Sequence, residues 1–481
     1  MAGRWRLTDD SAHLTDASRR TGGWTARALT ALLVAGCILL TGTPAQAGKK
    51  AAVKPVAAHK KKPHNGASKK AVKSPRAAAG RNPALKTVSL SPALAASALA
   101  INGAAAAKPA AREGEAEARL IEIYRLIGKA NGREALKRAQ SLVADHPNFQ
   151  LAQLVYGDLL SSQTRPIRSF GAVPDTMAQA AGPILPELRE ESLLRLQALR
   201  DSPPPGTIPS QFLALSPRSR HAIAIDTSRS RLYLFENTPT GQRLTADYYI
   251  SVGKSGTDKN AEGDQRTPLG VYYITSNLDP KSLKDFYGSG ALPLNYPNPY
   301  DASRGRTGSG IWLHGTPPNQ FSRAPKASDG CVVLANPDLE RIIRTVEVRT
   351  TPVVIARQLQ WVTPQSVKTD GKSFEEALQA WRSAKTSGDV SRVLGFYTAD
   401  FRNFSKTLPE WTPTLRQEIS SARGRGIELK DLSYLRWTDS ADTMVATFGE
   451  VLDGTRTGPV KRQYWVREGK QWKIFFEGVI G

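Results

Sequence analysis

Six short runs of β-branched and aromatic residues, separated by glycine and proline, constrain the fold of the middle of this chain most. The first is Ala222-Ile223-Ala224-Ile225, directly after His221. Runs of this length bounded by turn-forming residues are typical of strands. We therefore expect a mainly-β domain over residues 218–358, with a helix over 337–346 packed on its edge. The other expected strands are 231–235, 247–252, 270–274, 310–313 and 351–355.

The segment before this domain has a helical period. From residue 113, apolar side chains recur at intervals of three and four, as in Leu120, Ile123, Tyr124 and Ile127. We expect helical hairpins over residues 113–200, and then a proline-rich linker over 201–217. The last of these helices is expected around 187–200.

Three residues in the helical segment are spaced as in a tetratricopeptide repeat. They are Ala135, Pro147 and Gly157, so the segment resembles little more than one such repeat. A single repeat cannot bury its apolar face alone. A groove that docks a partner and a plain helical spacer therefore both remain open.

Residues 373–481 follow a second expected linker over 359–372 and place helices before strands. Helices are expected over 374–386 and 389–397, and the last strands over 463–466 and 472–477. This order describes an α+β cone. With Leu394-x-x-Phe-Tyr and a final Trp-Lys-Ile strand, it resembles the nuclear-transport-factor-two-like fold of the SnoaL or Cds6 C-terminal kind. That fold hosts enzymes and binding modules alike. We see no acid, base or metal set in this sequence, so we expect binding or dimerisation.

The first 47 residues have the features of a secretory signal peptide. Arg27 precedes an apolar stretch over 28–40, and Thr43-Pro44-Ala45-Gln46-Ala47 offers a cleavage site after Ala47. About 13 apolar residues are too few to span a bilayer, which needs roughly 20. Val34-Ala35-Gly36-Cys37 also resembles a lipoprotein box, so a lipoprotein and a cleaved soluble form both remain open. Either form predicts export to the periplasm or cell envelope.

The net charge of +23 is concentrated in one segment. Residues 48–112 hold eleven lysines and three arginines and no acidic residue. Such a Lys/Ala/Pro-rich stretch cannot form a core, so we expect a disordered tether. An exported chain meets the anionic envelope surface before it meets nucleic acid. We therefore expect the tether to lie on that surface, and we expect no nucleic-acid partner.

Removal of the signal peptide would leave one cysteine, Cys331, seventeen positions after His314. A lone thiol with a histidine available to share its site is a candidate nucleophile. A thiol of ordinary pKa near 8.5 is mostly protonated at neutral pH and needs a base. Gly330 permits a tight turn whose N–H groups face a developing oxyanion, and Ser328 can hydrogen-bond in that turn or support His314.

These residues belong to an ordered set of motifs. It comprises Gly253-Lys254, Gly263-Asp264, Thr267-Pro268-Leu269-Gly270, His314-Gly315-Thr316 and Ser328-Asp329-Gly330-Cys331. The set resembles the L,D-transpeptidase catalytic domain, also called the YkuD domain, over about 220–357. The resemblance implies a cysteine transferase acting on peptidoglycan stem peptides in cell-wall biogenesis and cell shape. Cys331 would form a thioester and expel the terminal D-alanine, and an amine from a second stem or an envelope protein would resolve it. It implies no metal and no organic cofactor.

Two positions depart from the family pattern. Asp329 stands where most members carry His, and Val333 stands where most carry Arg, which removes a cationic partner for a substrate carboxylate. Asp329, Gly315 and Arg266 are candidate substrate-binding residues. Lys254, Arg266 or Arg306 could replace the missing arginine. A hydrolase of the same fold, with water as acceptor, and a non-catalytic wall-binding scaffold remain the alternatives.

Overall fold

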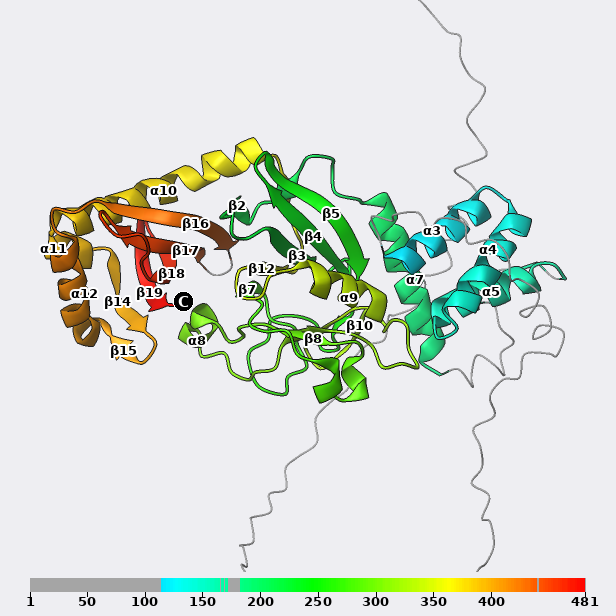
Figure 1. Cartoon of the computed structure of the whole chain (residues 1–481). Coiled ribbons are helices and arrows are strands. Elements are labelled where there is room, and N and C mark those ends of the chain that lie inside the picture. Colours follow the sequence, from blue (N-terminus) through cyan, green and yellow to red (C-terminus); the bar gives the residue numbers. More distant parts are fainter. Residues whose placement is uncertain (1–113, 165, 168, 172–181, 439–440, 481) are drawn as a thin grey trace, which may run out of the picture. The chain divides into compact units, whose positions relative to one another are not determined.

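The computed structural model describes residues 114–164, 166–167, 169–171, 182–438 and 441–480, which belong to one compact unit (Figure 1). The expected signal peptide and basic tether lie outside these residues. No helix in the described ranges combines the length and the apolar character that a membrane crossing requires.

The helical segment consists of α-helices, as its sequence period predicts. They are α3 (Glu115–Gly128), α4 (Gly132–Asp145), α5 (Gln150–Ser161) and α7 (Ile184–Arg200). Of the predicted apolar positions, Leu120 and Ile123 are fully buried and Tyr124 is partly buried, whereas Ile127 near the helix end is exposed. Asn131 caps α4 by accepting a hydrogen bond from the Glu134 N–H. The likeness to a tetratricopeptide repeat stays a prediction.

A buried ion network joins the helices to the β-rich domain. Glu117 Oε1 of α3 accepts hydrogen bonds from Arg195 of α7 and from Arg231, each at 2.7 Å. All three side chains are at most 3% exposed. Arg231 also donates to Asp247 at 2.8 Å. Buried charges of this kind are tolerated only when they are paired, so these contacts fix the segment to the domain.

The main sheet of the β-rich domain has the strand order β5-β4-β3-β12-β7. Its central strand β3 lies antiparallel to β4 and parallel to β12, with Ile223 opposite Val353. Strands β3 and β12 are buried on both faces, and their β-branched residues, such as Ile223 and Val354, are fully buried, which explains why apolar runs marked them. The strands are β3 (His221–Asp226), β4 (Arg231–Thr238), β5 (Gly241–Tyr249), β7 (Gly270–Tyr273) and β12 (Pro352–Ala356).

Two smaller sheets contain Gly253, His314 and Ser328 of the predicted motifs. Strands β8 (Ala291–Pro293), β9 (Trp312–His314) and β11 (Val332–Val333) form one of them, in the order β11-β9-β8. Strands β6 (Val252–Gly253) and β10 (Lys326–Ser328) pair in parallel. The expected edge helix is α9 (Asn336–Thr345), and the short helices are η2 (Pro280–Ser282), η3 (Asp285–Tyr287) and α8 (Pro299–Ser303).

Both expected linkers contain regular structure. Strand β1 (Ile208–Pro209) pairs with β13 (Trp361–Val362), and β2 (Phe212–Ala214) adds to the sheet of the C-terminal domain. Phe212 is fully buried, and its ring lies 5.4 Å from that of Phe235, so burial holds this segment in place. The second linker is short because α10 (Pro364–Ser387) begins ten residues before the predicted helix, with Thr363 as its cap.

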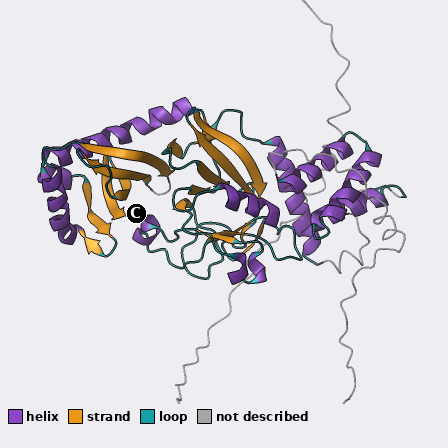
Figure 2. Ribbon diagram, in the orientation of Figure 1, coloured by secondary structure: helices purple, strands orange, loops and turns teal. Residues whose placement is uncertain are grey.

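The C-terminal domain places helices against a curved sheet, as predicted (Figure 2), but the sheet is mixed, since β14 pairs with β19 in parallel whereas the other main pairs are antiparallel. Its strand order is β15-β14-β19-β18-β17-β16, extended by β2. The predicted helix over 389–397 ends earlier, because Tyr397 already begins β14. The remaining elements are α11 (Val390–Leu394), β14 (Tyr397–Asn403), β15 (Lys406–Thr407), α12 (Leu408–Ala422), β16 (Ile427–Thr438), β17 (Asp442–Leu452), β18 (Val460–Glu468) and β19 (Gln471–Val479).

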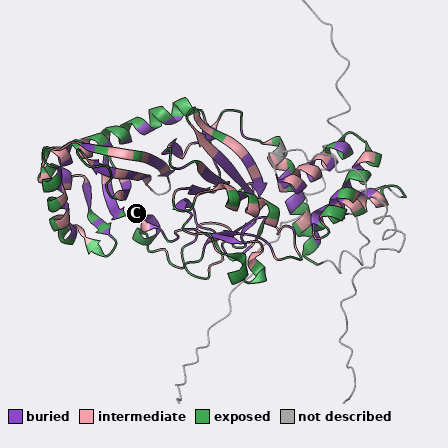
Figure 3. Ribbon diagram, viewed as in Figure 1, coloured by how far each residue is buried: buried purple, intermediate pink, exposed green. Residues whose placement is uncertain are grey.

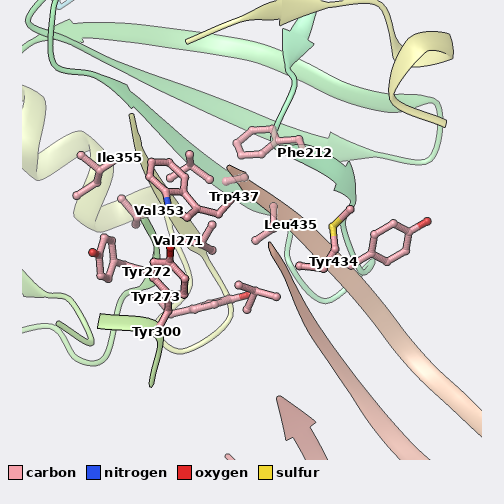
Figure 4. Packing of buried hydrophobic residues seen from close by; sticks show 14 of the residues in the cluster. Phe212, Val271, Tyr272, Tyr273, Tyr300, Val353, Ile355, Tyr434, Leu435 and Trp437 are labelled. Carbon is pink, nitrogen blue, oxygen red and sulfur yellow. The ribbon is translucent and has the colours of Figure 1, made fainter. Parts of the chain in front are cut away.

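One apolar cluster runs through the β-rich and C-terminal domains. Figure 4 shows tyrosines of the former, such as Tyr273 and Tyr300, near Leu435 and Trp437 of β16. The Arg462 guanidinium lies 3.4 Å from the centre of the Tyr273 ring. In Figure 3 the strands are largely buried, whereas the outer face of α10 is exposed. The two domains therefore share a core and do not merely adjoin through a flexible connection.

Candidate active site

Two short neighbouring strands bring the Cys331 and His314 segments together. Strand β11 lies parallel to β9, with Val333 opposite His314. Cys331 directly precedes β11 and receives a backbone hydrogen bond from Trp312, two residues before His314 on β9. The rings of Trp312 and His314 both contact Tyr287, so they lie on one side of β9. Residues that are seventeen positions apart in sequence therefore lie on neighbouring segments of the fold.

His314 is held in one tautomer. Its Nδ1 lies 2.7 Å from the carbonyl oxygen of Gly315. A carbonyl only accepts hydrogen bonds, so Nδ1 carries the proton and Nε2 is left as the basic nitrogen. Burial is the largest cause that lowers the His314 pKa to about 4. The ring is packed against Tyr287, with centroids 5.1 Å apart, and Phe286, at 5.9 Å. His314 is therefore a neutral base at physiological pH.

Asn336 fixes the turn that follows His314. Its Oδ1 accepts hydrogen bonds from the backbone N–H groups of Ser289 (3.0 Å) and Thr316 (3.1 Å), and its Nδ2 donates to Thr316 O (2.8 Å). A Cβ on Gly315 would lie 2.0 Å from that Oδ1. Gly315, predicted to bind substrate, thus lies against Asn336. Its carbonyl oxygen accepts the hydrogen bond from His314 Nδ1.

Ser328 and Gly330 shape the turn before Cys331. Ser328 Oγ donates to the Cys331 carbonyl oxygen at 2.6 Å and accepts from the Gly330 N–H at 3.1 Å. Of the two predicted roles for Ser328, the contacts match the one within the turn. Gly330 has φ +124°, and a Cβ there would lie 2.7 Å from the Arg266 carbonyl oxygen. Only glycine fits this position. Its N–H is occupied by Ser328, so its part in an oxyanion site stays a prediction.

The Cys331 thiol is partly buried and protonated. It donates to the Gly310 carbonyl oxygen at 3.3 Å. Burial is the main cause that raises the Cys331 pKa, and Asp329 raises it further, whereas the hydrogen bond from the Trp312 backbone and, to a smaller extent, Arg323 and Lys259 lower it. Within the described part of the chain, no hydrogen bond joins Cys331 to His314. Such contacts often tighten only when substrate binds.

The predicted cations near the site are mostly engaged. Lys254 Nζ pairs with Asp329 at 2.9 Å, and Arg306 pairs with Asp301 at 2.9 Å. Arg266 donates to the Thr257 carbonyl oxygen at 2.9 Å, while its own carbonyl oxygen forms the wall beside Gly330. The sequence reasoning missed Asn336 and Arg323.

Comparisons with known proteins agree with this architecture. Residues 220–355 match the family model of the L,D-transpeptidase catalytic domain, YkuD, and residues 373–478 match that of the Cds6 C-terminal NTF2-like domain. The chain carries an L,D-transpeptidase catalytic domain. This catalytic domain supports a peptidoglycan-related function. The resemblance stated from the motifs is confirmed for both domains.

Two solved structures are similar to this chain over 56% of its length. Bd1075 of Bdellovibrio bacteriovorus is 24% identical, with a TM-score of 0.49 over 56% of this chain and 97% of that one. The helical cell shape determining protein Pgp2 of Campylobacter jejuni is 22% identical, with a TM-score of 0.46 over 56% of this chain and 95% of that one. The comparison with curated proteins finds no match.

The C-terminal domain contains a charged cluster that its sequence did not reveal. Lys385 Nζ lies 2.7 Å from Glu418 and 2.6 Å from Glu450, and Lys461 Nζ lies 3.2 Å from Glu477. Both lysines are at most 1% exposed. The expectation that this domain has no catalytic acid or base set stays a prediction. Three carboxylates share two lysines, and Glu477 also accepts hydrogen bonds from Tyr397 and Gln463, which is the pairing that buried charges require.

No metal site is apparent in the described ranges, where no three His, Cys, Asp or Glu side chains are grouped to hold an ion. The expectation that catalysis needs no metal or organic cofactor stays a prediction.

Proposed function

We propose that this chain is an exported cysteine L,D-transpeptidase that acts on peptidoglycan stem peptides. The observation that carries the proposal is the hydrogen bond from the Trp312 backbone to Cys331, two residues before His314, whose Nε2 is left as the basic nitrogen. Within a matched catalytic domain, this pair supplies the nucleophile and the base that acyl transfer requires.

The chemistry is an exchange of one peptide bond for another. The Cys331 sulfur attacks the carbonyl between the diamino acid and the terminal D-alanine, and the thiol proton passes to His314 Nε2. The bond to D-alanine then breaks, its nitrogen takes the proton from His314, and a thioester remains on Cys331. An amine of a second stem or of an envelope protein attacks the thioester and returns the thiol proton through His314.

The environment of each group supports this division of labour. The raised pKa of Cys331 makes a free thiolate scarce at neutral pH, so a base has to act during attack. The lowered pKa of His314 keeps that base unprotonated. In this proposal the basic tether over 48–112 holds the enzyme at the anionic envelope, and the helical segment and C-terminal domain bind the wall or a partner.

The test is mass spectrometry of tetrapeptide muropeptides incubated with residues 48–481. A crosslinked dimer lighter by one D-alanine, absent with Cys331→Ala, is the expected product. A trimmed monomer that depends on Cys331 would replace the amine acceptor with water. Products unchanged by Cys331→Ala would refute the proposed nucleophile.

A further inference from the structure

The loop between His314 and the nucleophile carries an arginine that the motifs do not include. We propose that Arg323 binds the carboxylate of the terminal D-alanine and so selects stem peptides that end in a free acid. This inference rests on the proposed function and names how the same site recognises its leaving group.

Arg323 is held beside the reacting pair by an aromatic contact. Its guanidinium carbon lies 4.3 Å from the centre of the Phe286 ring, and the Phe286 ring lies 5.9 Å from that of His314. The Arg323 charge acts on both catalytic groups, since it lowers the pKa of His314 and that of Cys331. A cation that influences both groups stands close to where the scissile bond must lie.

The guanidinium has no partner among the residues that the structure describes. Its side chain forms no hydrogen bond or ion pair there, although it is partly buried. Burial lowers its pKa, with Asp329 and Cys331 acting in the opposite direction. Lys254, Arg266 and Arg306, the cations favoured from sequence, all have protein partners. A partly desolvated, unpaired arginine is an anion-binding group whose cost of burial is relieved by a ligand.

Arg323 also faces open space. It lines a cavity of about 650 Å³ together with Phe286 and Ser322; Glu187 and Glu191 of α7 also line this cavity, whereas His314 and Cys331 lie outside its lining. Such a volume accommodates the end of a peptide. Arg323 could also take the place of the arginine that most family members carry at position 333. Here that residue is Val333, which is only 2% exposed and carries no charge.

Bond counting favours the terminal carboxylate over others in a stem peptide. Three bonds separate the carbonyl carbon attacked by Cys331 from the carboxyl carbon of the residue that leaves. A carboxylate on the diamino-acid side chain lies at the far end of that chain. A cation close enough to act on both Cys331 and His314 therefore suits the nearer group.

The experiment compares two substrates that differ only in this carboxylate. Release of D-alanine from the tetrapeptide and of D-alaninamide from its C-terminal amide is measured for wild-type protein, Arg323→Gln and Arg323→Lys. Hydrogen bonds to a charged group are worth about 1.5–3 kcal/mol. Wild-type kcat/KM should therefore favour the acid by about 10- to 100-fold. Because each variant is scored by its acid-to-amide ratio, intrinsic differences between the two leaving groups cancel.

We expect Arg323→Gln to lower the acid-to-amide ratio by about 10- to 100-fold relative to wild type, mainly through slower release from the acid, because a neutral amide lacks the charge. Arg323→Lys should give an intermediate ratio, because an ammonium lacks the bidentate fork. Arg304→Gln is the matched control, since Arg304 also stacks on a ring, that of Tyr300 at 5.0 Å, but in the loop after α8.

Two results would overturn the inference while leaving the proposed function intact. They are an unchanged ratio in Arg323→Gln and an equal loss on both substrates. If wild-type protein releases neither product in a Cys331-dependent way, the proposed function fails and the inference fails with it.

Discussion

Thr267 Oγ1 donates a hydrogen bond of 2.9 Å to the carbonyl oxygen of Gly330. The same hydroxyl accepts the Gly253 N–H at 2.9 Å. Thr267 therefore ties together three motifs that are separate in the sequence: the Gly-Lys pair, the Thr-Pro-Leu-Gly turn and the Ser-Asp-Gly-Cys turn. The hydroxyl is fully buried, so both bonds are made without competition from water.

Thr267→Val should loosen the nucleophile turn while keeping its shape. Loss of the buried hydroxyl leaves the Gly253 N–H and the Gly330 carbonyl unsatisfied, which costs about 1–3 kcal/mol of unfolding free energy for each group. We expect a lower kcat with little change in KM, measured by D-alanine release. Thr267→Ser, which keeps the hydroxyl, should restore most of the lost unfolding free energy and most of the lost kcat. A kcat unaffected by Thr267→Val would show that the turn does not need this tie.

Gly330→Ala should be far more damaging than a glycine replacement at the same backbone angle elsewhere. Gly241 has φ +123° with nothing within 4 Å of an added Cβ, whereas at Gly330 the Cβ would lie 2.7 Å from the Arg266 carbonyl oxygen. Both variants bear a backbone strain of about 1–3 kcal/mol. Only Gly330→Ala should also displace Cys331, and a displacement of about 1 Å can cost 100-fold in rate. Equal activities of the two variants, by the same assay, would contradict this reading.

The pH profile of kcat/KM should reflect the lowered pKa of His314. The base works only when neutral, and a pKa of about 4 keeps it neutral down to mildly acidic pH. We therefore expect an acid limb near pH 4 and a plateau through neutral into alkaline pH. Phe286→Ala should expose His314 and remove the ring that supports Arg323. Burial and Arg323 both lower the His314 pKa, so their loss should raise that pKa and shift the acid limb to higher pH. A wild-type limb near 6.5, the ordinary histidine value, would contradict the burial argument.

The charged cluster of the C-terminal domain should contribute to stability. Lys461, 1% exposed, lies within 3.2 Å of both Glu450 and Glu477. Lys461→Met leaves buried carboxylates uncompensated and should cost about 3–5 kcal/mol. Lys430→Met, which removes an exposed pair with Glu428, should cost about 1 kcal/mol or less. Chemical denaturation of both variants compares their unfolding free energies. Similar denaturation midpoints would contradict a stabilising role for the buried cluster.

The sequence predicted the longer strands of the catalytic domain because their β-branched runs are bounded by glycine and proline. It missed β1, β2, β8, β10 and β11, since strands of two or three residues have no period to detect. The available sequence signal was Phe212, a large apolar residue in the expected linker. Such residues are usually buried, as Phe212 is in the structure.

The candidate site was predictable where motifs carry it and not elsewhere. Cys331, His314 and the turn residues follow from their spacing. Asn336 and Arg323 do not, because an isolated asparagine or arginine looks like a solvated residue until the fold supplies its neighbours. Lys385 and Lys461 illustrate the same limit, since they come from α10 and β18 and meet only in the folded domain.

The most direct test of the central claim is intact-protein mass spectrometry during turnover of a tetrapeptide substrate. The proposal predicts an adduct equal to the tetrapeptide less D-alanine, located on Cys331 by peptide mapping and released by hydroxylamine, as a thioester requires. The adduct should be absent in Cys331→Ala. D-alanine release by Cys331→Ala at the wild-type rate, without any adduct, would contradict the account.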